Sequence, residues 1–222
     1  MEFVLVGSQD DPDRTEEAMK LYYSQGTCSF APHVALREAG LAFDLARYDM
    51  KTAQLEGGGS LEAINDKGYV PVLELDDGER LTEVAVILQW IADQRPERDL
   101  APRPGSLARY RLQEWLNFIA TEIHKPYWPL FHGAPEAERD EARQRLARRF
   151  DWTQGKLGER PFLMGDGFTV ADCYLLTVLN WTRAAGIDLA RWPKLAEYRT
   201  RLGSRPSVRA AKEAEGLVRS AR

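Results

Sequence analysis

The sequence predicts an α/β domain followed by an all-α domain. Up to residue 95, short apolar runs with strand spacing alternate with helical segments, whereas every periodic segment after residue 105 has helical spacing. The stretch 96–105 between them holds three prolines and no periodicity, which is typical of a linker. We therefore expect domains at 19–95 and 106–222, with residues 1–18 as an extension outside the folded body.

The first domain reads as two successive units, β-α-β and then β-β-α. Its first helix ends at Gly40, a residue type favoured just after a helix C-terminus. Asp77-Gly78 lies between two strand-like runs and predicts a hairpin. The expected elements are, in chain order, a strand over 20–23, a turn over 24–29, a helix over 30–39, a strand over 43–48, strands over 70–75 and 80–82, and a helix over 83–93. This order is a thioredoxin-like arrangement.

The second domain is expected to contain only helices. Pro126 and Pro129 should stop or kink a long helix over 106–125. Thr169 and Asp172 match a capping box at the start of the most apolar helix, so we assign them to folding and not to catalysis. Further helices are predicted over 136–157, after Trp192 and after Arg205-Pro206.

Composition argues against several classes of function. The 222 residues are 44% hydrophobic and 29% charged, and the net charge of −4 is spread without a basic stripe, so we expect no nucleic-acid partner. No apolar run approaches the roughly 20 residues that span a bilayer, and the N-terminus lacks the pattern of a secretory signal. The two cysteines lie far apart in the sequence, so a reducing, cytoplasmic location is expected.

Four stretches of the chain carry a family resemblance. They are MKLYYSQGTCSFAPHVALREAGL (19–41), INDKGYVPVLELDDGERLTE (64–83), LQEWLNFIATEIHK (112–125) and FTVADCYLL (168–176). In this order, with Cys at position 28 and His-Lys at 124–125, they resemble the bacterial beta class of cytosolic glutathione transferases. The resemblance implies a homodimer, glutathione bound as co-substrate beside each thioredoxin-like domain, a small hydrophobic electrophile as second substrate, and no metal.

Cys28 directly precedes the helix predicted over 30–39. Unpaired N–H groups and the macrodipole at a helix N-terminus stabilise a thiolate, so we expect a depressed pKa for this thiol. Cys28-Ser29-Phe30-Ala31 is a C-x-x-C pattern without its second cysteine, which permits a mixed disulfide with a small thiol. The alternative is a small buried hydrophobe. The resemblance favours a catalytic Cys28, with Ser29 or His124 as alternative stabilisers of a glutathione thiolate.

The resemblance also implies the contacts to glutathione. Val70 and a cis Pro71 would present backbone groups that pair with the cysteinyl unit. Glu83 and Val84 open a helix whose N–H groups suit the γ-glutamyl carboxylate, while the Glu83 carboxylate suits its ammonium. The remaining residues of the implied site are Asn117, Thr121, His124 and Lys125. Simpler alternatives are an ordinary first-turn acid at Glu83, and cations at 124–125 that complement the helix dipole.

Two positions depart from the family pattern. Val84 stands where a small or hydroxyl residue is common, and Ala53 stands where the family has a lysine, although Lys51 lies two residues earlier. These departures favour an alternative function, a glutathione- or ligand-binding protein of the same fold with weak or no turnover.

The second substrate is expected between the two domains. Tyr127, Trp128 and Trp181 are candidates for an apolar wall there, although each taken singly could equally belong to the core. The main hypothesis is conjugation of glutathione to small electrophiles, with thiol-transferase or peroxidase activity as a side reaction. A narrower hypothesis is dehalogenation of an aromatic compound, for which the sequence identifies no substrate.

Overall fold

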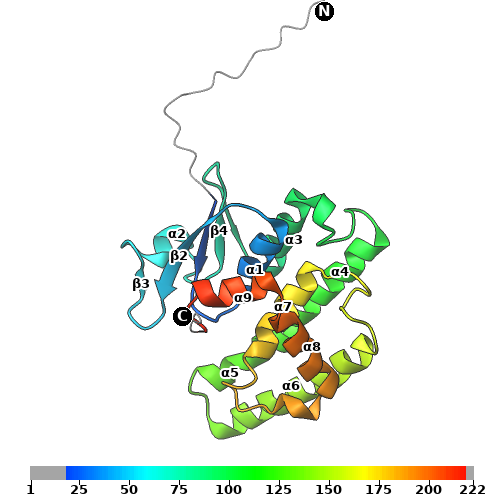
Figure 1. Cartoon of the computed structure of the whole chain (residues 1–222). Helices are drawn as coiled ribbons and strands as arrows, with labels where there is room; N and C mark the ends of the chain where they lie inside the picture. The colour runs from blue at the N-terminus through cyan, green and yellow to red at the C-terminus, as the bar shows by residue number, and fades with distance from the viewer. Residues whose placement is uncertain (1–18, 219–222) are drawn as a thin grey trace, which may run out of the picture.

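The computed structural model describes residues 19–218, and the predicted extension 1–18 lies outside the described residues. Figure 1 shows a sheet with helices packed on it in the upper part, and a larger group of helices below and to the right. The predicted order, an α/β part followed by helices alone, is confirmed.

The sheet has five strands in the order β3-β2-β1-β4-β5. They are β1 (Lys20–Tyr23), β2 (Asp44–Asp49), β3 (Gln54–Leu55), β4 (Val72–Glu74) and β5 (Arg80–Thr82). Central β1 runs parallel to β2 and antiparallel to β4, with Leu21 in register with Leu45 on one side and Leu73 on the other. Because Leu21 and Leu73 are fully buried, the middle of the sheet is fixed by apolar packing.

Three helices belong to the sheet domain, namely α1 (Phe30–Ala39), α2 (Leu61–Ile64) and α3 (Val84–Gln94). Helix α1 ends as predicted at Gly40, which has φ 68° in the left-handed region. Strand β3 and helix α2 escaped the sequence prediction, because segments of two and four residues are too short to show a period.

The rest of the described chain is helical. Its elements are η1 (Pro96–Arg98), α4 (Leu107–Phe118), η2 (Ile119–His124), η3 (Lys125–Tyr127), α5 (Trp128–Phe131), α6 (Glu136–Leu157), α7 (Val170–Asn180), η4 (Leu189–Arg191), α8 (Pro193–Gly203) and α9 (Pro206–Ala214). The predicted bounds of α6 and the helices after Trp192 and Arg205 are confirmed.

The segment predicted as one helix over 106–125 changes its winding halfway. It is α-helical to Phe118 and then becomes a π-helix, in which the Lys125 N–H donates to the Ala120 carbonyl. Pro126 follows directly, lacks an N–H, and in a regular helix would clash with the carbonyl four residues back, so a wider turn before it relieves the conflict. The side chains after Phe118 are therefore rotated relative to a regular helix.

Helix α7 forms the centre of the molecule, between α1 and α4 (Figure 1). All its residues from Val170 to Leu179 are buried, and the predicted capping box of Thr169 and Asp172 is confirmed. A second link between the domains is ionic, since buried Arg109 of α4 pairs with Asp93 of α3 at 2.7 Å. Both links hold the start of α1 at a fixed distance from the helical domain.

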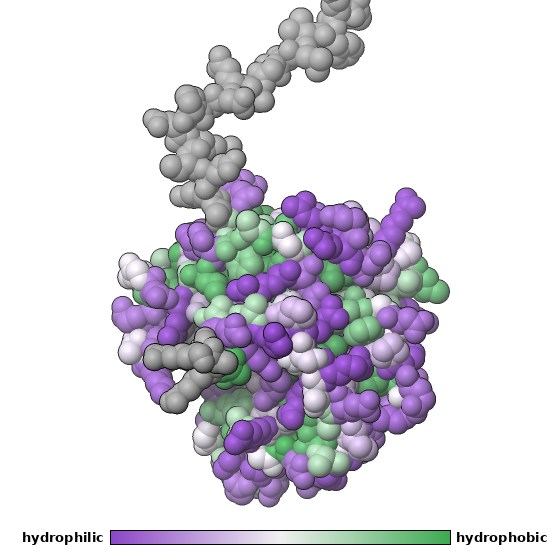
Figure 2. Space-filling view, viewed as in Figure 1, coloured by the Kyte–Doolittle hydropathy of each residue, from purple (hydrophilic) through white to green (hydrophobic). Residues whose placement is uncertain are grey.

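The surface is mixed. Figure 2 shows hydrophilic residues over most of the visible face, with apolar areas between them. Within residues 19–218, no helix combines the length and the apolar character needed to cross a membrane.

Candidate functional site

Cys28 lies, half-buried, in the loop between α1 and the C-terminal end of the central strand β1. Its Sγ–H donates to the Val70 carbonyl at 3.4 Å. Val70 precedes β4 and is joined to Pro71 by a cis peptide bond, as the resemblance implied. The structure therefore brings together three of the predicted site residues, Cys28, Val70 and Pro71, from two separate segments.

The pKa of Cys28 is shifted in the direction opposite to the expected one. Burial raises the pKa of the Cys28 thiol to about 12, whereas the backbone N–H groups of Cys28 and Ser29 lower it by less. Although the residue keeps some exposed surface, protein atoms surround the sulfur closely enough for desolvation to dominate. The prediction of a depressed pKa is therefore wrong: Cys28 remains a protonated thiol at neutral pH and acts as a donor.

Ser29 is fully buried, and its hydroxyl group forms hydrogen bonds within its own loop. Its Oγ accepts from the Ser24 N–H at 3.1 Å, donates to the Ser24 carbonyl at 3.1 Å, and lies 2.8 Å from Thr27 Oγ1. These contacts argue against the role of thiolate stabiliser that the sequence suggested for Ser29, because its hydroxyl group is already engaged inside the loop.

Glu83 and Val84 stand at the start of α3. Glu83 has φ 69°, in the region that non-glycine residues rarely adopt. A hydrogen bond from Tyr69 lowers the pKa of Glu83, and Lys67 lowers it further, so the carboxylate is ionised. Val84 is buried, and its N–H is among the first of α3, where a helix provides no internal acceptors. This helix start can thus present both N–H donors and a carboxylate.

His124 is an uncharged member of the site. Burial, and then the positive charge of Lys125, lower the pKa of His124 to about 4. Its Nδ1 lies 2.8 Å from the Tyr174 hydroxyl. A neutral ring that accepts this hydroxyl proton at Nδ1 carries its own proton on Nε2 and is a donor there. His124 can therefore offer a hydrogen bond from a neutral ring, and it carries no positive charge at neutral pH.

The other polar residues predicted on the long helix are exposed. Lys125 acts electrostatically on both His124 and Glu83, which places its charge near the start of α3. Thr121 Oγ1 donates to the Asn117 carbonyl at 3.1 Å, along their own helix. Lys125 therefore remains a strong candidate to bind an anionic group of a ligand. Asn117 and Thr121 form no hydrogen bond to the sheet domain among the described residues.

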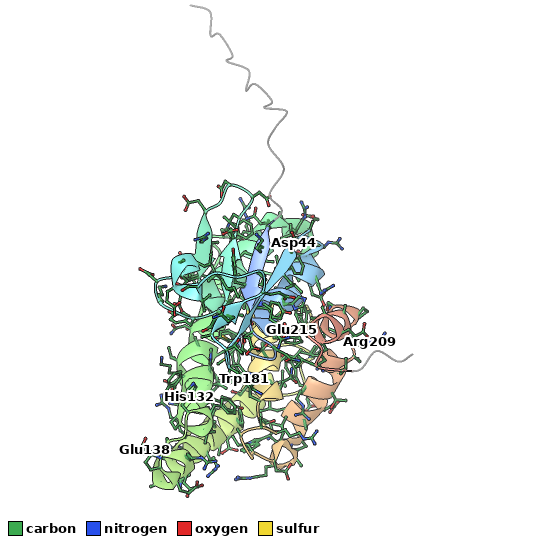
Figure 3. All side chains as sticks on the ribbon, turned by 90° about the vertical axis from the view of Figure 1, so that its left-hand side faces the viewer. Asp44, His132, Glu138, Trp181, Arg209 and Glu215 are labelled. Atoms are coloured by element: carbon green, nitrogen blue, oxygen red, sulfur yellow. The ribbon has the colours of Figure 1, made fainter. Side chains whose placement is uncertain are left out.

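The three aromatic candidates separate in space. Trp181 joins the domains, because its Nε1–H donates to the Gly26 carbonyl at 2.9 Å and its ring centroid lies 4.9 Å from that of His124. The Tyr127 ring meets Trp181 edge-on at 5.4 Å. Trp128 is 61% exposed and stacks on His132, which lies further from the sheet than Trp181 (Figure 3). Trp181 is partly exposed and can offer apolar surface at the domain junction, whereas Tyr127 is 1% exposed and belongs to the core, and Trp128 stacks on His132.

Several residues of the site were missed by sequence reasoning. Phe131 stacks on Tyr127 at 5.7 Å, and Tyr174 contacts His124 from α7. Glu215 lies at the domain junction (Figure 3) and accepts from the Gly26 N–H at 2.9 Å, while its other oxygen is 2.8 Å from His33 Nδ1. These partners carry no local signal, since they come from distant parts of the chain. His33 is fully buried between Glu215 and Arg37 and has a structural role.

The described residues contain no group of three or more His, Cys, Asp or Glu side chains that could hold a metal ion. The polar groups of this region are instead the Cys28 thiol, backbone groups, the neutral imidazole of His124 and the ionised Glu83 carboxylate. Such a set suits a small zwitterionic ligand with a sulfur atom.

Known proteins are similar to this chain over most of its length. The family model described as Glutathione S-transferase, N-terminal domain, matches residues 27–94, and the model of the C-terminal domain matches residues 118–206. A glutathione S-transferase of Escherichia coli O157:H7, GstA, is 42% identical over 200 residues, which cover 90% of this chain and 100% of the relative. The chain belongs to the glutathione S-transferase family.

Solved structures show which class of the family the chain resembles. A sphingomonad glutathione S-transferase complexed with glutathione matches with a TM-score of 0.86 and 42% identity, covering 90% of this chain and 100% of that one. A bacterial beta-class glutathione S-transferase of Sphingomonas chungbukensis matches with a TM-score of 0.87 and 44% identity over the same shares. The predicted bacterial beta class and the glutathione transferase fold are confirmed.

Proposed function

We propose that this transferase binds glutathione against β4 and the starts of α1 and α3, and conjugates its sulfur to a small hydrophobic electrophile. The observation that carries the proposal is the contact of Cys28 Sγ with the Val70 carbonyl, beside the cis peptide bond to Pro71. It puts a thiol donor next to the backbone groups that can pair with a cysteinyl unit.

The contacts follow from the chemistry of the ligand. The N–H groups of α3 near Val84 suit the γ-glutamyl carboxylate, and the ionised Glu83 suits its ammonium. Lys125 is the candidate partner for the glycyl carboxylate. Trp181, whose ring lies next to that of His124, supplies apolar surface for the electrophile.

The thiol of Cys28 acts by donating a hydrogen bond. When the cysteinyl N–H of glutathione pairs with the Val70 carbonyl, the Cys28 S–H loses that acceptor and can turn to the ligand sulfur. A donor aimed at a thiolate lowers the free energy of its charge, and neutral His124 can add a second donor. Glutathione gives up its thiol proton to solvent, the resulting thiolate attacks the electrophile, and the leaving group departs with the electron pair of its bond to carbon.

A turnover assay with glutathione and a chloronitrobenzene tests this proposal. Wild-type protein should conjugate, and Cys28→Ala should lower kcat by about tenfold, the order of magnitude of one lost hydrogen bond to a charged group. The matched control is Cys173→Ala, a change at the fully buried second cysteine, which should leave kcat per folded molecule unchanged.

The alternative is a binding protein with weak or no turnover. Val84 brings no hydroxyl group to the start of α3, and Ala53 lies in an exposed turn where a lysine is common in the family. Lys51 is also exposed, and its N–H is used by Asp49. Glutathione binding by calorimetry without conjugation of the chloronitrobenzene or turnover of hydroxyethyl disulfide would favour this alternative.

We propose in addition a homodimer in the cytoplasm. Val86 on α3 is 47% exposed and Leu107 on α4 is 71% exposed, which leaves apolar surface for a second copy. Both cysteines are free, which suits a reducing compartment. Light scattering should give the mass of two chains at micromolar concentration, and Leu107→Asp should shift it towards one; a wild-type mass of one chain contradicts the dimer.

A further inference from the structure

The loop 65–69 is folded around one buried side chain, Asn65. The Asn65 Nδ2–H donates to the Tyr69 carbonyl at 2.7 Å, and its Oδ1 accepts from the Lys67 N–H at 3.2 Å. The Gly68 N–H donates to the Asn65 carbonyl at 2.9 Å. Because backbone groups of three consecutive residues, 67 to 69, are tied to Asn65, the side chains of Lys67 and Tyr69 leave the loop from fixed positions.

Both of these side chains reach Glu83. The Tyr69 hydroxyl donates to Glu83 Oε1 at 2.6 Å, and Lys67 Nζ lies 3.3 Å from the same oxygen and 2.8 Å from Thr82 Oγ1. Lys67 Nζ also stands 5.9 Å from the centroid of the Tyr69 ring. The two residues hold the same carboxylate oxygen from the side of the loop.

The contacts from Tyr69 and Lys67 fix the orientation of the Glu83 carboxylate. Its side chain is 55% exposed, and its backbone has φ 69°, so neither burial nor ordinary helix geometry fixes the carboxylate. Since Tyr69 and Lys67 both contact Oε1, Oε2 accepts no hydrogen bond from residues 19–218 and is left for a ligand. We propose that Tyr69 is a positioning residue of the glutathione site, which holds the Glu83 carboxylate so that Oε2 faces the α-ammonium of the γ-glutamyl unit. This inference rests on the proposed function.

Tyr69 carries more of this effect than Lys67. A short O–H···O⁻ bond is a charge-assisted hydrogen bond of the strong kind. The Lys67–Glu83 pair is exposed on both sides, at 45% and 55%, and such pairs contribute little because water screens them. The bond to Glu83 is also the first cause that raises the pKa of Tyr69 to about 12, so the hydroxyl remains a donor at any physiological pH.

The test compares two ligands on two variants. The ligands are glutathione and its glutaryl analogue, which lacks only the α-amino group of the γ-glutamyl unit. The variants are Tyr69→Phe, which removes the hydroxyl and keeps the ring, and the control Tyr110→Phe, at an exposed tyrosine on α4. Calorimetry gives the Kd of each pair, and steady-state assays give KM and kcat for glutathione.

We expect Tyr69→Phe to weaken the binding of glutathione about five- to tenfold, which is the lower end of the effect of losing a hydrogen bond to a charged group. KM should rise by the same factor while kcat stays the same. The glutaryl analogue should bind wild type and Tyr69→Phe equally, and Tyr110→Phe should behave as wild type with both ligands.

Two results overturn the inference while the proposed function stands: an unchanged Kd for glutathione in Tyr69→Phe, or an equal loss for glutathione and the glutaryl analogue. The second result would mean that Tyr69 shapes the pocket and does not act through the ammonium. If wild type binds no glutathione, the proposed function fails and this inference falls with it.

Discussion

The starts of α1 and α7 each hold a buried titratable group, and their surroundings differ. At α7, the Asp172 carboxylate accepts from the N–H groups of Leu163 and Thr169 and from the Tyr198 hydroxyl, all at 2.7–2.9 Å. At α1, the Cys28 thiol donates its hydrogen bond to the Val70 carbonyl. Burial raises the pKa of both groups; four hydrogen bonds oppose the rise at Asp172, and the backbone N–H groups of Cys28 and Ser29 oppose it at Cys28.

The comparison shows that a helix N-terminus does not by itself set the charge of a buried group. Desolvation acts on any enclosed thiol or carboxyl group, whereas the macrodipole contributes typically only 0.3–1 kcal/mol, a rough general figure. In both groups desolvation outweighs the donors, and the difference lies in the partners: the Asp172 oxygens accept several hydrogen bonds, whereas the Cys28 thiol donates to a single carbonyl. The start of α7 is therefore closed and structural, while the start of α1 keeps a protonated donor and an acceptor that a ligand can separate.

The largest expected effect concerns the reactivity of Cys28. With a pKa of about 12, its alkylation at neutral pH should be roughly a thousandfold slower than that of an unperturbed thiol of pKa about 8.5, since the thiolate is the nucleophile. Iodoacetamide rates measured against pH on a Cys173→Ala background report this thiol alone. The urea-unfolded chain is the control and should react at the ordinary rate. A midpoint below about 8.5 in the folded protein would restore the thiolate account.

The second effect concerns stability. Asp172→Ala should destabilise the fold by roughly 3 kcal/mol, because it leaves several buried donors without an acceptor. Glutathione affinity of the folded fraction should be unchanged. The control is Asp188→Ala, at the exposed cap of η4, where the loss should be at most about 1 kcal/mol in urea unfolding. Equal losses for both variants would show that burial of the cap does not matter.

The third and smallest effect is a pH dependence from His124. Its folded pKa of about 4 lies below the unperturbed value of 6.5, so the unfolded chain takes up the proton first as the pH falls. Stability should therefore decrease between pH 6.5 and about 4, and His124→Asn should show a shallower decrease of the thermal midpoint over this range. Parallel curves for wild type and variant would contradict a buried neutral His124.

The sequence was most informative where structure is local. Gly40 ends α1, the turn at Asp77-Gly78 joins β4 to β5, and the Thr169–Asp172 box starts α7, because each feature depends on neighbours within a few residues. The π-helix before Pro126 was missed, since a sequence period shows apolar spacing but not how the backbone relieves a clash.

The site was predictable only in part for the same reason. Tyr69 meets Glu83 across 14 residues, Tyr174 meets His124 across 50, and Gly26 meets Glu215 across 189. The resemblance supplied Cys28, Val70 and Glu83 as positions, but the charge of each group depends on packing that no local pattern encodes. The pKa of Cys28 was therefore mispredicted although its place was right.

A crystal structure of the wild-type protein with glutathione tests the central claim most directly. We predict that the cysteinyl backbone of glutathione pairs with Val70, and that its sulfur lies within hydrogen-bonding distance of Cys28 Sγ without a covalent bond. The γ-glutamyl ammonium should lie on Glu83 Oε2. A disulfide between Cys28 and glutathione, or a sulfur placed away from Cys28, would contradict the account of Cys28 as a neutral donor.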